Sequence, residues 1–349
     1  MELKSNQILL KALEYHASDM HFHPQRTDTL VQFRIDSSLV EVERMSKLIY
    51  ERLISFFKFQ AGMNIGEKRR PQTGSLVLML ENQLINLRLS TLPTPYLESL
   101  TLRILPQNAH HSLSTLSLFP TSAQKLNAIA QKPHGLILIT GPTGSGKTTT
   151  LHAMLEAANS TKKRRIITIE DPIEKYCEEF IQVEVNEKAG VTYLEGFKAL
   201  LRHDPDIIMI GEIRDAETAK LVVRAALTGH LVLSTVHTRD SIGALFRMLE
   251  LGIPLQDLLQ TLIAVVAQRL IEIACPFCKG SCHSLCLKMR QIRRLAVFEV
   301  LTEQHLSDVG RAIQSNTHLF PKFSLIKDQL KTAVSLGYIN EKSYEWWSG

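Results

Sequence analysis

The ten residues Gly141 to Thr150, with the sequence GPTGSGKTTT, restrict what this chain can fold into more than any other stretch. Two glycines enclose four residues and are followed by Lys147 and Thr148, which is the spacing GxxxxGK[ST] of a phosphate-binding loop. Small residues with wide backbone freedom let several N–H groups turn toward one anion, and the dipole of the following helix points at it. The apolar run 136–140 predicts a buried strand before the loop. The motif therefore predicts a site for a nucleoside triphosphate.

Each part of this loop has a predicted role. Lys147 supplies positive charge to the β- and γ-phosphates, and the Thr148 hydroxyl is a ligand for Mg²⁺. A chance Gly/Ser-rich turn is the alternative, and the strand-like and helix-like segments on either side argue against it. The predicted nucleotide-binding residues of the loop are Gly141, Pro142, Thr143, Gly144, Ser145, Gly146, Lys147, Thr148 and Thr149.

Four apolar segments alternate with helical patterns from residue 136 onward, which predicts a parallel sheet of the α/β class. Their near-continuous Ile, Leu and Val content is typical of strands that are buried on both faces. Ligands of open α/β sheets bind beyond the carboxyl ends of the strands, so the polar residues that follow each strand should converge on the nucleotide. The predicted strands are 136–140, 166–170, 207–210 and 231–236.

Charged residues at these strand ends are the candidates for the chemistry. Glu212 follows 207–210 in a Walker B-like position, and Glu170 ends 166–170. One would orient or deprotonate the attacking water and the other would hold Mg²⁺ through its water shell, and the sequence leaves both assignments open. His230 and His237 flank the fourth strand and are candidates for sensing the γ-phosphate. The alternatives are exposed carboxylates and ordinary packed histidines.

The residues before the loop predict a separate small α+β module. Helices are expected over 6–16 and 46–60, with Ser46 as an N-cap, and strands over 29–35, 39–43, 75–80, 84–90 and 99–105. The stretch 106–117 loses periodicity, which predicts a linker. Beyond residue 254 the chain is expected to be helical to about residue 273 and again in its last part, to about residue 346.

Composition limits the function classes. The net charge of +5 is small for 349 residues and is spread along the chain, whereas a nucleic-acid-binding protein usually concentrates basic residues on one face. No uninterrupted apolar run reaches about 18 residues, and the amphipathic pattern of residues 1–15 does not resemble a signal peptide. We therefore expect a cytoplasmic protein without direct nucleic-acid contacts.

Four cysteines lie within twelve residues, at Cys275, Cys278, Cys282 and Cys286. In a cytoplasmic chain this spacing predicts a tetrahedral Zn²⁺ site, with free or buried thiols as the alternative. His283 could replace one thiolate. Cys177 lies apart and is expected to be an ordinary loop residue.

Together these motifs resemble the secretion and type IV pilus ATPases of the GspE/PilB/PilT superfamily, and within it the competence branch. The segments 166–174 (IITIEDPIE), 201–215 (LRHDPDIIMIGEIRD) and 228–238 (TGHLVLSTVHT) resemble its Asp box, Walker B and His box. The resemblance implies a P-loop RecA-like parallel-sheet ATPase domain, an N-terminal α+β domain of PAS-like type and a helical, cysteine-containing C-terminal region. The expected boundaries are 1–107, a linker at 108–118, 119–270 and 271–349.

The resemblance also implies roles that the residues alone do not. Arg88 and Arg103, in paired strands, would approach the γ-phosphate from the N-terminal domain, whereas a salt bridge to a local carboxylate is the alternative. It implies ATP as the nucleotide, a homohexameric ring and a polytopic platform protein at the inner face of the cell membrane. The tetracysteine element is typical of assembly motors.

The expected function is therefore a Mg²⁺-dependent ATPase that drives assembly of a competence pseudopilus, a machine for DNA uptake that resembles type II secretion systems. A pilus-retraction or protein-secretion motor is the alternative within the class. A nucleic-acid translocase, or a nucleotide-gated binding module without turnover, is the alternative from another class.

Overall fold

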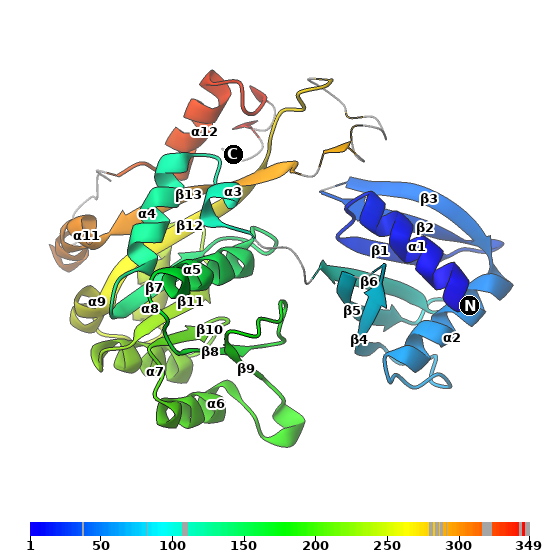
Figure 1. Cartoon of the computed structure of the whole chain (residues 1–349), viewed down its shortest axis with the longest axis horizontal. Helices are drawn as coiled ribbons and strands as arrows, with labels where there is room; N and C mark the ends of the chain where they lie inside the picture. The colour runs from blue at the N-terminus through cyan, green and yellow to red at the C-terminus, as the bar shows by residue number, and fades with distance from the viewer. Residues whose placement is uncertain are drawn as a thin grey trace. The chain divides into compact units, whose positions relative to one another are not determined.

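The chain forms two compact units in its computed structural model, Met1–Ala109 with Cys275–Arg293, and His110–Ala274 with Arg294–Gly349. The structure describes residues 1–36, 38–81, 83–106, 111–278, 282, 286, 289–290, 292–315, 323–341 and 344–345. Each unit has its own hydrophobic core. Figure 1 labels their helices and strands.

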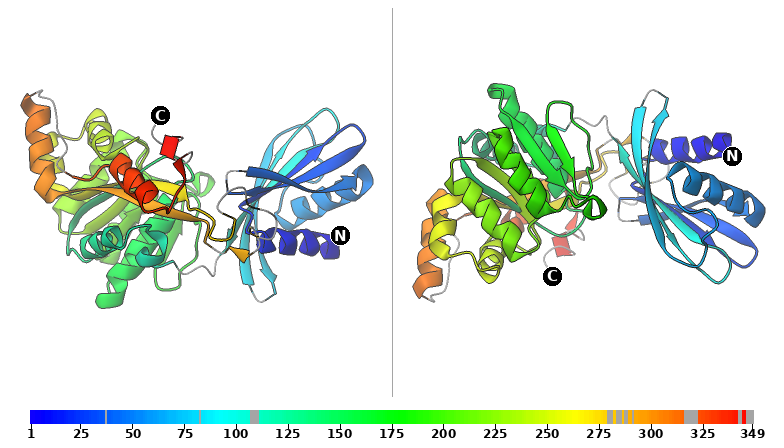
Figure 2. Two further views of the ribbon diagram at one scale, coloured as in Figure 1. Left: turned by 90° about the horizontal axis from the view of Figure 1, so that it is seen from above. Right: turned by 90° about the horizontal axis from the view of Figure 1, so that it is seen from below.

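The first unit is built on a six-stranded antiparallel sheet with the strand order β3-β2-β1-β6-β5-β4. Helices α1 (Glu2–Glu14) and α2 (Lys47–Gln60) cover one face of this sheet (Figure 2). The Ser46 hydroxyl accepts a hydrogen bond from the Ile49 amide and so caps α2, as expected. The strands are β1 (Asp19–Pro24), β2 (Asp28–Ile35), β3 (Ser38–Ser46), β4 (Gln72–Leu80), β5 (Gln83–Leu92) and β6 (Ser99–Pro106).

The segment Cys275–Arg293 packs with this first unit through a buried arginine. Arg293 Nε lies 3.0 Å from Asp36 Oδ2, and its Nη2 donates to the main-chain carbonyls of Tyr15 and His16, each at 3.4 Å. Only 5% of the Arg293 side chain is exposed. A buried charge needs such partners, so this arginine fastens the segment to the end of α1.

The second unit contains a seven-stranded sheet with the order β13-β12-β7-β11-β10-β8-β9. All pairs are parallel except β12 with β13. The strands are β7 (Gly135–Thr140), β8 (Ile166–Glu170), β9 (Ile181–Glu184), β10 (Ile207–Ile210), β11 (Leu231–Val236), β12 (Leu262–Glu272) and β13 (Arg294–Thr302). The α/β class and the parallel sheet expected from the sequence are confirmed.

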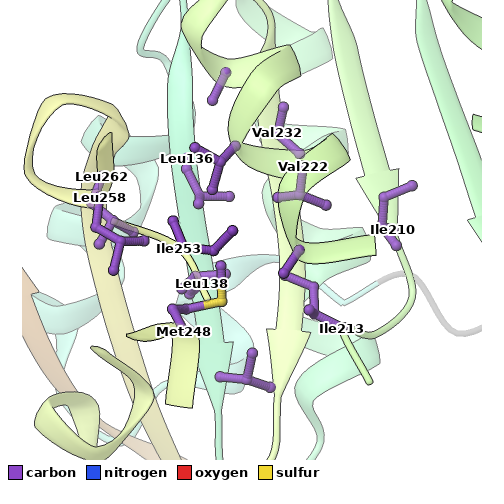
Figure 3. Close-up of a cluster of buried hydrophobic side chains, with 14 of the residues drawn as sticks. Leu136, Leu138, Ile210, Ile213, Val222, Val232, Met248, Ile253, Leu258 and Leu262 are labelled. Atoms are coloured by element: carbon purple, nitrogen blue, oxygen red, sulfur yellow. The ribbon is translucent and has the colours of Figure 1, made fainter. Parts of the chain in front are cut away.

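Helices cover both faces of this sheet, because alternate residues of its central strands enter two different cores. Leu136 and Leu138 of β7 pack with α6, α7, α8 and α9, as Figure 3 shows in part, whereas Ile137 and Ile139 pack with α3, α4 and α5. The helices are α3 (Leu113–Leu116), α4 (Pro120–Ala130), α5 (Lys147–Thr161), α6 (Tyr193–Leu200), α7 (Ala216–Leu227), α8 (Ser241–Glu250), α9 (Leu255–Thr261), α11 (Glu303–Ser315) and α12 (Ile326–Ser335).

Two parts of the C-terminal region differ from the sequence prediction. Residues 262–272, expected to be helical, form strand β12 beside β7, and residues 294–302 form β13, which was not predicted. Short apolar runs fit a buried strand and a buried helix equally well, and the partner that decides lies far along the sequence. Strands β1 and β9 were also not predicted.

Some sequence predictions fall outside the described residues, namely the start of the linker at 108–110, His283 and the end of the last helix at residue 346. In the part of the chain that the structure describes, no helix has both the length and the apolar character needed to cross a membrane.

Candidate nucleotide-binding site

The phosphate loop connects the buried strand β7 to α5, and its backbone has the conformation that the motif predicts. Gly141 and Gly146 have φ angles of +151° and +84°, and Gly146 is the N-cap of α5. A Cβ atom on Gly141 would lie 2.5 Å from the Gln268 carbonyl oxygen, so only glycine fits there. The loop is therefore a tight turn with the positive end of a helix dipole at its mouth.

Lys147 and the hydroxyl residues of the loop lie where an anion would need them. Lys147 Nζ donates to the carbonyl oxygens of Gly141 at 2.9 Å and Pro142 at 3.1 Å. Burial lowers the pKa of its ammonium group, Glu174 opposes this effect and Arg269 adds to it. Ser145 Oγ is buried without a hydrogen-bond partner among the described residues. An unpaired buried hydroxyl beside a lysine fits a phosphate group.

The remaining loop residues belong to the same turn. Thr148 is half-buried in the first turn of α5, and the neighbouring Thr149 is exposed. Pro142, Thr143 and Gly144 are exposed at the turn itself. The structure therefore brings all nine predicted loop residues together, and the Thr148 hydroxyl has the position in the motif that a Mg²⁺ ligand requires.

Glu170 ends β8 and is held by donors from three elements. Its Oε1 accepts hydrogen bonds from Thr168 Oγ1 at 2.8 Å and Gln182 Nε2 at 3.1 Å, and its Oε2 lies 3.3 Å from His152 Nε2. The residue is only 2% exposed. Burial acts to raise the pKa of Glu170, but the hydrogen bonds from His152, Thr168 and Gln182 outweigh it, so the pKa is lowered. Glu170 is thus a buried carboxylate that is kept ionised.

Glu212 follows β10 and is paired with two cationic or titratable side chains. It forms an ion pair with Arg214 Nε, and its Oε2 lies 3.3 Å from His237 Nε2. Burial lowers the pKa of His237, and the positive charges of Lys147 and Arg214 add to this effect. His237 therefore lies within electrostatic reach of the loop lysine, and its lowered pKa favours the neutral ring.

The structure does not bring His230 to this edge of the sheet. His230 precedes β11, and its carbonyl oxygen accepts a hydrogen bond from the Gly135 amide at the beginning of β7. Its Nδ1 lies 3.1 Å from the Ala225 carbonyl oxygen. Seven strand positions separate it from His237, which corresponds to about 23 Å. His230 therefore lies at the end of β11 that is remote from the phosphate loop, and its role in sensing the γ-phosphate stays a prediction.

Two residues of β12 meet the loop and were missed as site residues by the sequence analysis. Gln268 Nε2 donates to the Ser145 carbonyl oxygen at 2.6 Å, and Arg269 Nη1 donates to the Gln268 carbonyl oxygen at 2.9 Å. The parallel register pairs Ala267 with Thr140, the last residue of β7. Because this stretch was expected to be helical, nothing in the sequence pattern placed it beside the loop.

Arg88 and Arg103 belong to the first unit, where they are direct neighbours across β5 and β6. Cross-strand register continues this row from Arg103 to Asp19 in β1 and from Asp19 to Arg34 in β2. Direct cross-strand partners share one face of a sheet, so three arginines and one carboxylate lie in a single row. Arg103 Nε donates to Asp19 Oδ1 at 2.8 Å. The row is a cationic surface, and its approach to a phosphate stays a prediction.

The four clustered cysteines are close enough to bind one metal ion. Their Sγ atoms all lie within 4.8 Å of one another, and Cys278 Sγ lies 3.8 Å from Cys282 Sγ. A tetrahedron with Zn–S bonds of about 2.3 Å has S–S edges of about 3.8 Å. Arg290 is buried and donates from Nη1 to Cys282 Sγ at 3.6 Å, which offsets negative charge on the thiolates. The cluster fits the expected zinc site.

We expect the full chain to be purified with about one zinc ion per molecule, because four thiolates satisfy tetrahedral zinc. Cys278→Ser should remove most of this metal, as measured by elemental analysis of the folded protein. Cys177→Ser is the matched control and should retain it, since Cys177 lies outside the cluster. A stable wild-type protein with no metal and four titratable thiols in the cluster would contradict the prediction.

A family model and individual relatives match this chain over most of its length. The family model for type II/IV secretion system proteins matches residues 1–337. The competence protein ComGA of Bacillus subtilis (strain 168) is 45% identical over 348 residues, covering 99% of this chain and 98% of its own length. The type II secretion system protein E of Dickeya dadantii (strain 3937) is 44% identical over 275 residues, and this alignment covers 78% of this chain and 55% of that longer protein.

Among solved structures, the pilus retraction motor PilT with bound ADP matches with a TM-score of 0.68 and 26% identity. That match covers 98% of this chain and 96% of the PilT chain. The match therefore extends over both units of this chain. The chain belongs to the type II/IV secretion system protein family, and it is an ATP-hydrolysing enzyme.

Proposed function

We propose that this chain is the Mg²⁺-dependent ATPase that powers assembly of a competence-type pseudopilus, acting as a homohexameric ring at the cytoplasmic side of the membrane. The observation that carries the proposal is the meeting of the phosphate loop, Glu170, Glu212 and His237 at one edge of a parallel sheet. The similarity to ComGA over nearly the whole chain supports the competence system as its setting.

In this proposal the loop amides, Ser145 and Lys147 bind the β- and γ-phosphates of ATP, with the Thr148 hydroxyl as a ligand for the metal. Bound Mg²⁺ would supply positive charge to these phosphate oxygens. One of the two glutamates accepts the proton of the attacking water or orients it, and the other accepts hydrogen bonds from water in the shell of the metal. His237, whose lowered pKa favours the neutral ring, can donate a hydrogen bond to the γ-phosphate.

The cationic row of the first unit couples nucleotide binding and release to movement of the two units. Arg88 and Arg103 would add positive charge to the γ-phosphate only when an N-terminal unit closes over a nucleotide, so binding and release become rigid-body movements. A polytopic membrane platform protein would receive this movement. The four cysteines favour assembly over retraction, and the moderate, spread charge favours a protein partner over nucleic acid.

The deciding experiment combines phosphate release with the mass of the assembly. Wild type should hydrolyse ATP in a Mg²⁺-dependent manner and form a hexamer, as measured by mass photometry. Glu212→Gln should keep the hexamer and nucleotide binding but lose about 100-fold or more in turnover, since it removes a carboxylate that acts on the water. An active monomer would contradict the ring, and turnover that DNA stimulates strongly would favour a translocase.

A retraction or secretion motor is the second candidate, and the similarity to PilT and to the type II secretion system protein E favours it. A deletion strain separates these functions. Loss of surface filaments supports assembly, hyperpiliation supports retraction, and loss of a secreted protein alone supports secretion.

A further inference from the structure

The imidazole of His152 connects the helix of the phosphate loop to the buried carboxylate of Glu170. His152 lies in α5, one helical turn after Thr148, and is 3% exposed. Residues one turn apart share a helix face, so the ring lies on the side of α5 that carries the expected metal ligand. Its Nε2 atom is 3.3 Å from Glu170 Oε2. The sequence analysis assigned no role to this histidine.

An aromatic ring and a buried carboxylate both pack against the imidazole of His152. The rings of His152 and Phe180 are stacked, with centroids 6.3 Å apart and planes inclined by 28°. Nδ1 is buried without a hydrogen-bond partner among the described residues. An ionised carboxylate only accepts hydrogen bonds, so Nε2 must carry the proton that it shares with Glu170. The nitrogen of His152 that carries the shared proton is thereby assigned as Nε2.

The two carboxylate oxygens of Glu170 accept different numbers of hydrogen bonds. Thr168 and Gln182 both donate to Oε1, whereas His152 is the donor to Oε2 among the described residues. Without the imidazole, Oε2 would be buried and unpaired. An unpaired buried carboxylate oxygen favours protonation or rotation of the side chain.

We propose that His152 is a positioning residue for ATP hydrolysis, which holds the carboxylate of Glu170 in place and fixes the direction of its Oε2 atom. The inference rests on the proposed function, in which Glu170 is one of the two glutamates of the hydrolytic site. It holds for both roles open to Glu170, because a base must accept a proton and a holder of metal-bound water must accept hydrogen bonds. His152 itself need not touch the nucleotide.

The test compares two substitutions of similar size. His152→Leu removes the donor, and His152→Gln places an amide N–H near the position of Nε2. We expect His152→Leu to lower kcat about 10- to 100-fold, part of the range for a misplaced acid–base group. Binding of a fluorescent ATP analogue should stay within about 3-fold, because the phosphate loop is unchanged. His152→Gln should recover at least about a third of the wild-type kcat. Met154→Ala, a buried truncation in the same helix, is the control for a general loss of packing.

The outcomes separate this inference from the proposed function. If Glu170→Gln is inactive while His152→Leu turns over as fast as Met154→Ala, His152 has no positioning role. If His152→Gln loses as much turnover as His152→Leu in a folded protein, the hydrogen bond is not what matters, and the proposal also fails. If Lys147→Ala and Glu170→Gln both keep wild-type turnover, the proposed function itself is wrong.

One measurement needs no substitution at His152, so it tests the proposal even if the His152→Leu protein does not fold. Spectra of ¹⁵N-histidine-labelled full-length protein should show the proton of His152 on Nε2, and Glu170→Gln should shift this signal. A ring protonated on Nδ1 alone would overturn the assignment, because Nε2 could then not donate to Glu170.

Discussion

Lys147→Ala should lower ATP turnover about 100-fold or more, because it removes the cation that the loop holds for the β- and γ-phosphates. The loss of one preorganised electrostatic donor in a water-poor site typically costs about 10²–10³ in rate. The expected loss falls on both nucleotide affinity and kcat, since the lysine acts on bound ATP and on the transition state alike. Phosphate release under saturating and limiting ATP separates the two effects.

The matched control for this variant is Lys163→Ala. Lys163 is 79% exposed and pairs only with the exposed Glu179 among the described residues, so its loss should leave turnover within about 2-fold. A Lys147→Ala protein that hydrolyses ATP at the wild-type rate would show that the loop does not bind the reacting phosphates.

Arg88→Ala and Arg103→Ala should each reduce turnover by about 10³-fold while leaving the binding of ATP nearly unchanged. An arginine that reaches the γ-phosphate from another module is worth about 10³–10⁵ in kcat. Neither residue belongs to the loop that binds the nucleotide, so affinity is expected to survive. Turnover and the dissociation constant of a fluorescent nucleotide are the two measurements.

Arg44→Ala supplies the comparison within the same unit. Arg44 in β3 is exposed and pairs with Glu41 and Asp28 on the surface, and its loss should leave turnover unchanged. If Arg103→Ala keeps normal turnover but destabilises the first unit, the 2.8 Å bond to Asp19 is its whole role, as in the salt-bridge alternative. That result would remove Arg103 from the proposed mechanism, and normal turnover of Arg88→Ala would remove Arg88.

The central fold could be predicted because its strands carry a strong local signal. The runs 136–140, 166–170, 207–210 and 231–236 are short and mostly apolar, which is typical of strands buried on both faces. Their order along the chain, and the loop motif after the first, were enough to predict that Glu170, Glu212 and His237 follow strands at the edge of the sheet that carries the phosphate loop.

Other features depend on partners that no local pattern reveals. Strand β12 has the same apolar content as a buried helix, and its identity is decided by β7 and β13 on either side. His230 and His237 look equivalent in the sequence, but they lie at opposite ends of β11. The contact between His152 and Glu170 depends on how α5 packs against the sheet. A single histidine in a predicted helix does not indicate such a contact in the sequence.

The pairing of Arg293 with Asp36 has a practical consequence for dividing this protein into fragments. Residues 275–293 are folded with the first unit although both flanking segments belong to the second. A fragment that starts at residue 111 would carry this insert without Asp36 and the end of α1, so Arg293 would lose the partners that hold the insert in place. A fragment that ends at residue 106 would lack the insert altogether. A fragment of the second unit should therefore be made without residues 275–293, and a fragment of the first unit should have these residues added to it.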